Sequence, residues 1–107
     1  MTEIDHGHIA LTLCGEEFTL TPTLEAMTAI DRQFGSLREA AFQVQQVSLA
    51  AIIHIINAGA ALDRKERERI PDLVFRHGVL KVVPVIGDYI AALMNPTGEE
   101  STGEGKG

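Results

Sequence analysis

The sequence has one cysteine, few aromatic residues and few bases, and each shortage excludes a class of protein. Because Cys14 has no second cysteine to pair with, no disulfide within the chain can stabilise the fold, and a reducing cytoplasm is the simpler setting. Nine lysines and arginines stand against fifteen acids, a net charge of −6 that argues against binding to a phosphate backbone. The 107 residues, 45% of them hydrophobic, suffice for one core. We therefore expect one small acidic domain whose partner is a protein and not a nucleic acid.

The sequence also lacks a long hydrophobic run and the motifs of the common enzyme classes. Its least polar stretch, residues 47–62, contains Ser48, His54 and Asn57 and is shorter than the roughly 20 residues of a membrane-spanning helix. The first residues, MTEIDHGHIA, do not resemble a secretory signal. No glycine-rich phosphate loop, HExxH or GxSxG occurs. We expect no membrane partner, no enzymatic activity and no cofactor.

Two small groups of polar residues are the candidates for a ligand site. His6, His8 and Cys14 offer imidazole and thiolate, which suit zinc or copper, but their spacing matches no closed zinc site. His54 and Asn57 are three residues apart, so they share a helix face, where such pairs more often satisfy each other or a loop carbonyl. We expect a metal site at neither group.

Apolar and polar residues alternate over residues 8–21, which predicts a β-hairpin with one apolar face. A loop at residues 15–16 would place Leu13 opposite Phe18, and Leu11 opposite Leu20. A loop at residues 14–15 would shift the register by two and keep the same apolar face, but Cys14 would need a positive φ. We predict the first register. Since a lone hairpin is not stable, it must pack on helices or extend a sheet of another chain.

The rest of the chain has helical spacing of its apolar residues up to Asn95. Capping residues (Thr21, Ser36 and Ser48 at starts, Gly35 and Gly78 at ends) predict helices over about 22–34, 37–45, 48–62, 71–77 and 80–94. Pro71 is expected to open the fourth helix, and the charged segment 63–69 to be a solvated spacer. Residues 96–107 are rich in Gly and Glu and predict a flexible acidic tail. The expected fold is α+β and mostly helical, with a single domain over 1–95: an N-terminal β-hairpin followed by a bundle of four to five helices.

The order of these segments resembles a known family. GHIALTLCGEEFTLTPTLEAMTAID precedes a short capped helix, an Ala/Ile-rich helix, a polar spacer and a final apolar helix. Over roughly residues 7–94 this resembles the small protein encoded between the tail tube and tape measure proteins of gene transfer agents and related long-tailed phages. That family is often labelled a tail tube protein and is better understood as a tail assembly chaperone. The most specific part is LTL, Gly15, FTL and then TPT leading to Leu24 and Ile30; relatives usually have Asp-Gly where this chain has Cys14-Gly15.

The resemblance implies a non-catalytic role in the cytoplasm of a bacterial host cell. Such chaperones coat the apolar, helical tape measure protein before the tail tube polymerises around it, keep it soluble and pass it to the tube subunits. The implied partners are the tape measure protein and the tail tube protein, with a homo-oligomer as a further possibility. The candidate contact residues lie on the hairpin and the last helix, where they could equally fill the core: Phe18, Leu20, Val82, Val85, Ile86 and Tyr89.

Two other functions remain open from the sequence. The chain could be a structural tail protein, a tube or connector subunit, that stays in the particle, although one hairpin is few strands for a ring-shaped sheet. It could also be a small regulator that binds a ligand or metal through the histidines and Cys14, or through His54 and Asn57.

Overall fold

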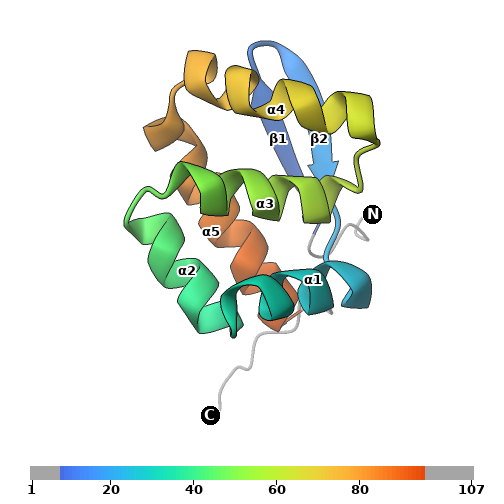
Figure 1. Ribbon diagram of the computed structural model, residues 1–107, viewed down its shortest axis with the longest axis vertical. Helices are drawn as coiled ribbons and strands as arrows, with labels where there is room; N and C mark the ends of the chain where they lie inside the picture. The colour runs from blue at the N-terminus through green and yellow to red at the C-terminus, as the bar shows by residue number, and fades with distance from the viewer. Residues whose placement is uncertain (1–7, 96–107) are drawn as a thin grey trace, which may run out of the picture.

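The computed structural model describes residues 8–95 and confirms the expected fold class (Figure 1). An antiparallel hairpin is followed by five helices. The strands are β1 (Ile9–Leu13) and β2 (Glu16–Leu20), and the helices are α1 (Leu24–Phe34), α2 (Leu37–Gln45), α3 (Leu49–Ala60), α4 (Arg64–His77) and α5 (Val79–Met94). The predicted tail, residues 96–107, lies outside the described residues.

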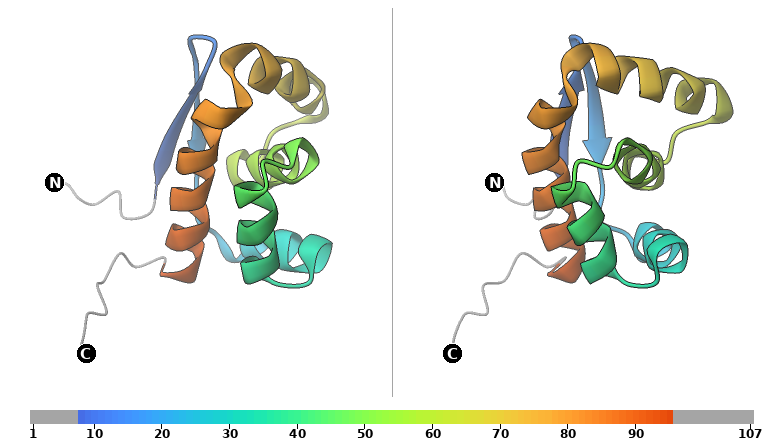
Figure 2. Two further views of the ribbon diagram at one scale, coloured as in Figure 1. Left: turned by 90° about the vertical axis from the view of Figure 1, so that its left-hand side faces the viewer. Right: turned by 60° about the vertical axis from the view of Figure 1, so that its left-hand side comes forward.

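The hairpin and the helices form two layers with a shared apolar core. Figure 2 shows the hairpin and α5 on one side and α1, α2 and α3 on the other, while α4 crosses one end. Contacts of β1 with α5 and of β2 with α3 seat the hairpin on the helices. Leu11, Leu13 and Leu20 point into this core and are almost completely buried, whereas Thr12 and Thr19 are exposed. The predicted apolar face of the hairpin is therefore confirmed.

The predicted register of the hairpin is wrong by two residues. Leu13 pairs with Glu16, Leu11 with Phe18, and Ile9 with Leu20. The loop is thus Cys14-Gly15, with φ of 52° at Cys14 and 85° at Gly15. Two consecutive positive φ values are typical of the type I′ turn, whose twist matches that of the strands.

Contacts with α4 offset the unfavourable φ of Cys14. Its backbone N–H donates to His77 Nδ1 at 3.2 Å, and its thiol donates to the carbonyl of Leu73 at 3.6 Å. A non-glycine residue in the left-handed region costs roughly 1–2 kcal/mol, about what one or two hydrogen bonds return. These long-range contacts stabilise the observed register, and the local alternation of apolar residues does not reveal them.

The helix starts are partly as predicted. Ser36 and Ser48 cap α2 and α3, where their hydroxyls accept from the backbone N–H of Glu39 and Ala51. The sequence predicts Thr21 as the cap of the first helix, but Thr23 has that role and accepts from the N–H of Ala26 at 3.0 Å. Thr21 instead donates its N–H to the carbonyl of Gly59, which ties the end of the hairpin to α3.

Helix α4 is longer than predicted, because the charged segment 63–69 is helical. Asp63 caps it, and Asp63 and Glu66 form a reciprocal capping box. Pro71 lies inside the helix and not at its start. Its missing N–H leaves the carbonyl of Arg67 without a helical partner, but Arg67 is exposed, so water can supply the bond.

Candidate interaction surface

The predicted contact residues lie mostly in the core. Leu20, Val82, Ile86 and Tyr89 are at most 1% exposed, whereas Phe18 and Val85 are half-buried. The folded chain therefore does not present the first four to a partner. Regular spacing of apolar residues is a pattern that core and contact residues share.

Tyr89 joins the hairpin, α3 and α5 at one point of the core. Its hydroxyl donates to the carbonyl of Thr21 at 2.7 Å, and its ring lies against Gly59. Thr21 in turn donates to the carbonyl of Gly59 at 3.0 Å. Gly59, near the end of α3, has no side chain and so leaves room for the Tyr89 ring.

We expect the ionisation of Tyr89 to destabilise the fold at alkaline pH. Burial raises the pKa of Tyr89 to about 12 from an ordinary 10.0. Since the folded-state pKa is the higher one, the contribution of the neutral phenol is fully present below pH 10.0 and lost as the pH rises through about 12. Tyrosinate absorbance measures this directly, because the chain has one tyrosine.

The variant Tyr89→Phe is the control for this titration. Its free energy of unfolding should not show the part of the alkaline decline that belongs to the phenol of Tyr89. A tyrosinate midpoint near the ordinary 10.0 in a chain that still gives a native circular dichroism spectrum would contradict the expectation.

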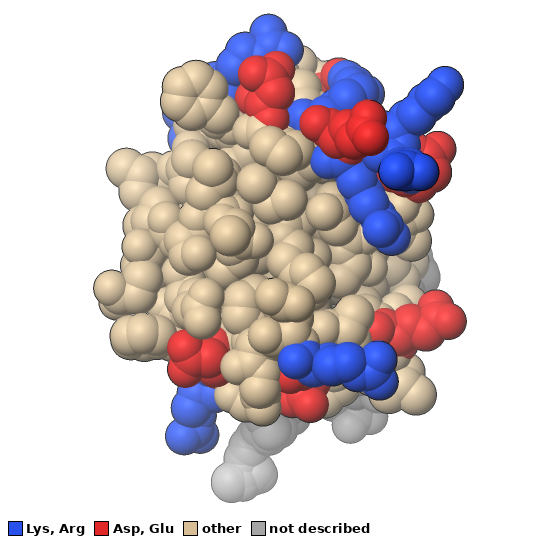
Figure 3. All heavy atoms as spheres, in the orientation of Figure 1, with Lys and Arg blue, Asp and Glu red and all other residues tan. Residues whose placement is uncertain are grey.

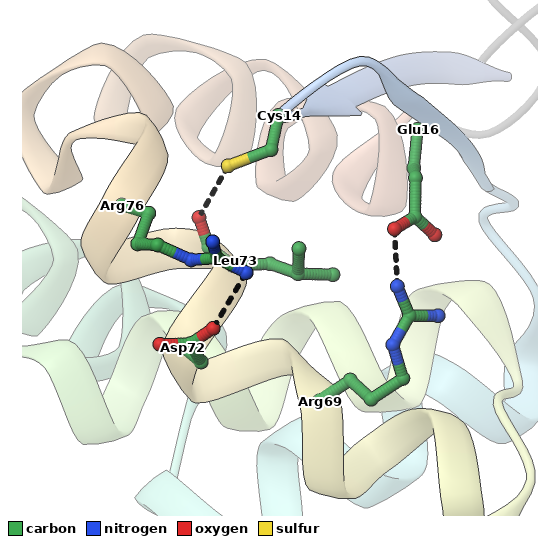
Figure 4. Close-up of polar contacts among 6 residues, drawn as sticks. All are labelled: Cys14, Glu16, Arg69, Asp72, Leu73 and Arg76. Atoms are coloured by element: carbon green, nitrogen blue, oxygen red, sulfur yellow. Dashed lines mark hydrogen bonds and ion pairs between the residues drawn. The ribbon is translucent and has the colours of Figure 1, made fainter.

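The hairpin turn is held to α4 by polar contacts (Figure 4). Besides the bonds of Cys14, Arg69 of α4 pairs with Glu16, and the Glu16 carboxylate raises the pKa of Arg69 above its ordinary value. The bond from Cys14 N–H requires an unprotonated Nδ1 on His77. These contacts dock the hairpin turn on α4.

His54 and Asn57 share a helix face as predicted, but they do not satisfy each other. His54 Nε2 and Asn57 Oδ1 are buried and have no hydrogen-bond partner, so that expectation is wrong for these two atoms. The His54 ring packs edge-on against Phe34, with 5.6 Å between ring centroids. Leaving such atoms unpaired costs roughly 1–3 kcal/mol each.

The described residues contain no cluster of three or more His, Cys, Asp or Glu side chains that could hold a metal ion. Of the candidate ligands, His8 and Cys14 lie at opposite ends of the β1 region, and His6 lies outside the described residues.

The feature that the sequence reasoning missed is a surface without charge over α2 and α3. From Ala40 to Leu62 no residue carries a formal charge. In Figure 3 the charged side chains gather at the α4 end and at the opposite, α1 end of the molecule, and the broad region between them has none. We call the exposed and half-buried residues of 40–62 the α2–α3 surface. In the sequence, this surface corresponds to the longest stretch without a charged residue.

Large apolar side chains are exposed on the α2–α3 surface. Phe42 of α2 is 56% exposed, and Val47 and Leu49, at the junction with α3, are 38% and 39% exposed. Val47 also has a φ of 60°, which is unfavourable for a β-branched residue and would suit glycine. The backbone geometry in the folded chain therefore does not favour valine at this position.

Among residues 8–95, no single helix has both the length and the apolar character needed to cross a membrane. Helices α4 and α5 meet the criterion only as a pair, and they are bent by 119° relative to each other.

Comparison with known proteins found no matching family model, no matching curated protein and no matching solved structure.

Proposed function

We propose that this chain is a non-catalytic tail assembly chaperone of a long-tailed phage or gene transfer agent. It binds the apolar, helical tape measure protein through the α2–α3 surface and assists assembly of the tail tube in the bacterial cytoplasm. The observation that carries the binding role is the uncharged surface with its exposed Phe42, Val47 and Leu49. The phage-tail context is supported by the sequence resemblance over roughly residues 7–94.

The chemistry of the α2–α3 surface suits an apolar client. A charged partner would lose the hydration of its charges on this surface and find no opposite charge there. An apolar helix has no charges to dehydrate. Binding would also remove the exposed apolar side chains from water, at roughly 25 cal/mol per Å². The charged ends of the molecule, visible in Figure 3, keep the chaperone soluble while the uncharged region is occupied.

Val47 supports a binding role over a purely structural one. A left-handed backbone costs a valine roughly 1–2 kcal/mol relative to glycine, and 38% of Val47 remains exposed to solvent. Strained residues are often retained where they act in function. An apolar side chain that contacts the client would account for valine here.

The test is co-expression with the tape measure protein encoded in the same gene cluster. Wild-type chain should keep that protein soluble and co-purify with it. We expect Val47→Gly and Phe42→Ser each to weaken capture by roughly tenfold, about 1.4 kcal/mol of binding free energy. Val47→Gly should at the same time leave the melting temperature unchanged or raise it, because it relieves the strained φ.

Phe75→Ser is the matched control, since Phe75 is 72% exposed but lies on α4 outside the α2–α3 surface. It should capture the tape measure protein as well as wild type does. Equal capture by all variants would contradict the proposed surface. A gene cluster without a long, coiled-coil-rich protein would contradict the tail role, and stoichiometric amounts of the chain in purified tails would favour a structural subunit.

A further inference from the structure

Helix α3 carries two buried polar atoms that the fold leaves without a partner. His54 Nε2 and Asn57 Oδ1 have no hydrogen-bond partner within the part of the chain that the structure describes. Unpaired buried atoms of this kind are rare in native proteins, and each one lowers the stability of the fold. Packing of the chain therefore gives no reason for these two polar side chains, whereas a bound group that completes their hydrogen bonds would give one.

Both residues lie on the outward face of α3, within the α2–α3 surface. Ala50, His54 and Asn57 are spaced by four and three residues, so they form one row along the helix. Ala50 is exposed, and His54 and Asn57 are half-buried. Among the described elements, none crosses in front of α3 in Figure 1. The opposite face of the helix is buried in the core: Ala51, Ile52, Ile55, Ile56 and Gly59.

The surroundings of the row allow a partner helix to reach the two atoms. Ala50 has a small side chain, which lets a second helix approach α3 closely. The His54 ring packs edge-on against Phe34, a contact that orients the ring without a hydrogen bond to Nε2. Because His54 and Asn57 are only half-buried, rotation of their terminal torsions, which are broad, brings the two atoms to an incoming group.

The chemistry of the two atoms selects the group that fits them. Asn57 Oδ1 only accepts hydrogen bonds, whereas His54 Nε2 donates or accepts, depending on which ring nitrogen carries the proton. A primary amide has two N–H donors and a carbonyl acceptor, so it satisfies both atoms with either form of the imidazole. A hydroxyl has one hydrogen and does so with only one form. A charged group would find no opposite charge between Ala40 and Leu62.

We propose that His54 and Asn57 bind a primary amide, the side chain of an asparagine or glutamine on the apolar helix that occupies the α2–α3 surface. The inference rests on the proposed function, in which the tape measure protein supplies that helix, and it adds which polar residue the surface selects. One polar contact within an apolar interface fixes the position of the bound helix, because a shift would leave the amide and both α3 atoms unpaired.

The experiment is co-expression of the full chain with the tape measure protein of the same gene cluster, using the variants Asn57→Leu and His54→Phe. Each variant removes one unpaired atom and keeps a side chain of similar size. The melting temperature should stay the same or rise, because a buried unpaired atom is gone. Capture should nevertheless fall roughly tenfold, because the client amide then enters the contact without its partner. A merely structural role would move stability and capture in the same direction.

Gln33→Leu is the matched control. Gln33 has an exposed amide on α1, outside the α2–α3 surface, so its replacement should leave capture unchanged. Client variants in which single asparagines or glutamines are replaced by leucine then identify the contacting residue. In the Asn57→Leu background, the loss of that client amide should have no further effect on capture.

The outcomes separate this inference from the proposed function. If the wild-type chain does not capture the tape measure protein, the proposed function is wrong and the amide contact is wrong with it. If Phe42→Ser weakens capture while Asn57→Leu and His54→Phe do not, the client binds the α2–α3 surface and the amide contact alone is overturned. A clear drop in the melting temperature of Asn57→Leu would show that Oδ1 is satisfied within the fold, by an internal water, and would also overturn the inference.

Discussion

Leu20→Asp is expected to unfold the chain, whereas Thr19→Asp is expected to leave it folded. Leu20 is fully buried in the core, between the hairpin and the helices, and no residue of the described core is charged. A carboxylate there would have no partner, and an uncompensated buried charge costs roughly 3–5 kcal/mol, a large part of the stability of a small domain. Loss of the native circular dichroism spectrum in the absence of denaturant is the measurement.

Thr19 is the control because it is next to Leu20 on the same strand with an exposed side chain. An aspartate there remains in water and costs only its poorer strand propensity, within about 1 kcal/mol. Equal loss of structure in both variants would contradict the assignment of faces on β2. The pair also tests whether Leu20 is a core residue, as the structure has it, or a partner contact, as the resemblance implies.

The face of each strand could be predicted from the alternation of apolar residues, but the alternation does not determine the register. Alternation alone places Leu11 and Leu20 inward, because the period of two is local. The choice between the two loops depends on Cys14, whose positive φ is offset by His77 and Leu73, about sixty positions further along the chain. Nothing near Cys14 in the sequence indicates these partners.

The start of α4 was mispredicted because two local signals compete. A proline is common in the first turn of a helix, and for this reason the sequence predicts that the helix starts at Pro71. The capping box of Asp63 and Glu66 is the stronger signal, and Pro71 is tolerated inside the helix because the residue four positions before it, Arg67, is exposed. Pro84 in α5 repeats this arrangement, four residues after the exposed Leu80.

The candidate interaction surface was missed because apolar spacing does not distinguish a core residue from a contact residue. Ile86 and Tyr89 have the regular spacing of a buried stripe and are buried. Phe42 has an alanine and a glutamine as its sequence neighbours and does not belong to a regular apolar stripe, yet it is exposed. The absence of charge from Ala40 to Leu62 was the better indicator, because an exposed helix of a soluble protein ordinarily has a charged face.

Gly59→Ala is expected to destabilise the fold although alanine is the better helix former. A Cβ at residue 59 would lie 2.8 Å from Tyr89 Cζ and 2.9 Å from Cε2, closer than carbon atoms approach each other. The ring has no room to withdraw, because Tyr89 is fully buried and its hydroxyl is held by the carbonyl of Thr21. Overpacking of this kind costs roughly 1–3 kcal/mol, more than the gain of about 1 kcal/mol in helix propensity. Urea denaturation measures the difference.

Gly87→Ala is the matched control, and a third variant identifies the cause. Gly87 lies inside α5, and a Cβ at this residue would have no atom within 4 Å outside its own helical turn, so alanine there should stabilise the fold by up to about 1 kcal/mol. The two glycine substitutions thus have opposite expected signs. In a Tyr89→Leu background the obstructing ring is gone, so Gly59→Ala should become neutral or stabilising. If Gly59→Ala costs the same with and without the ring, the destabilisation does not come from Tyr89, and the close contact between α3 and α5 is not what requires glycine at this position.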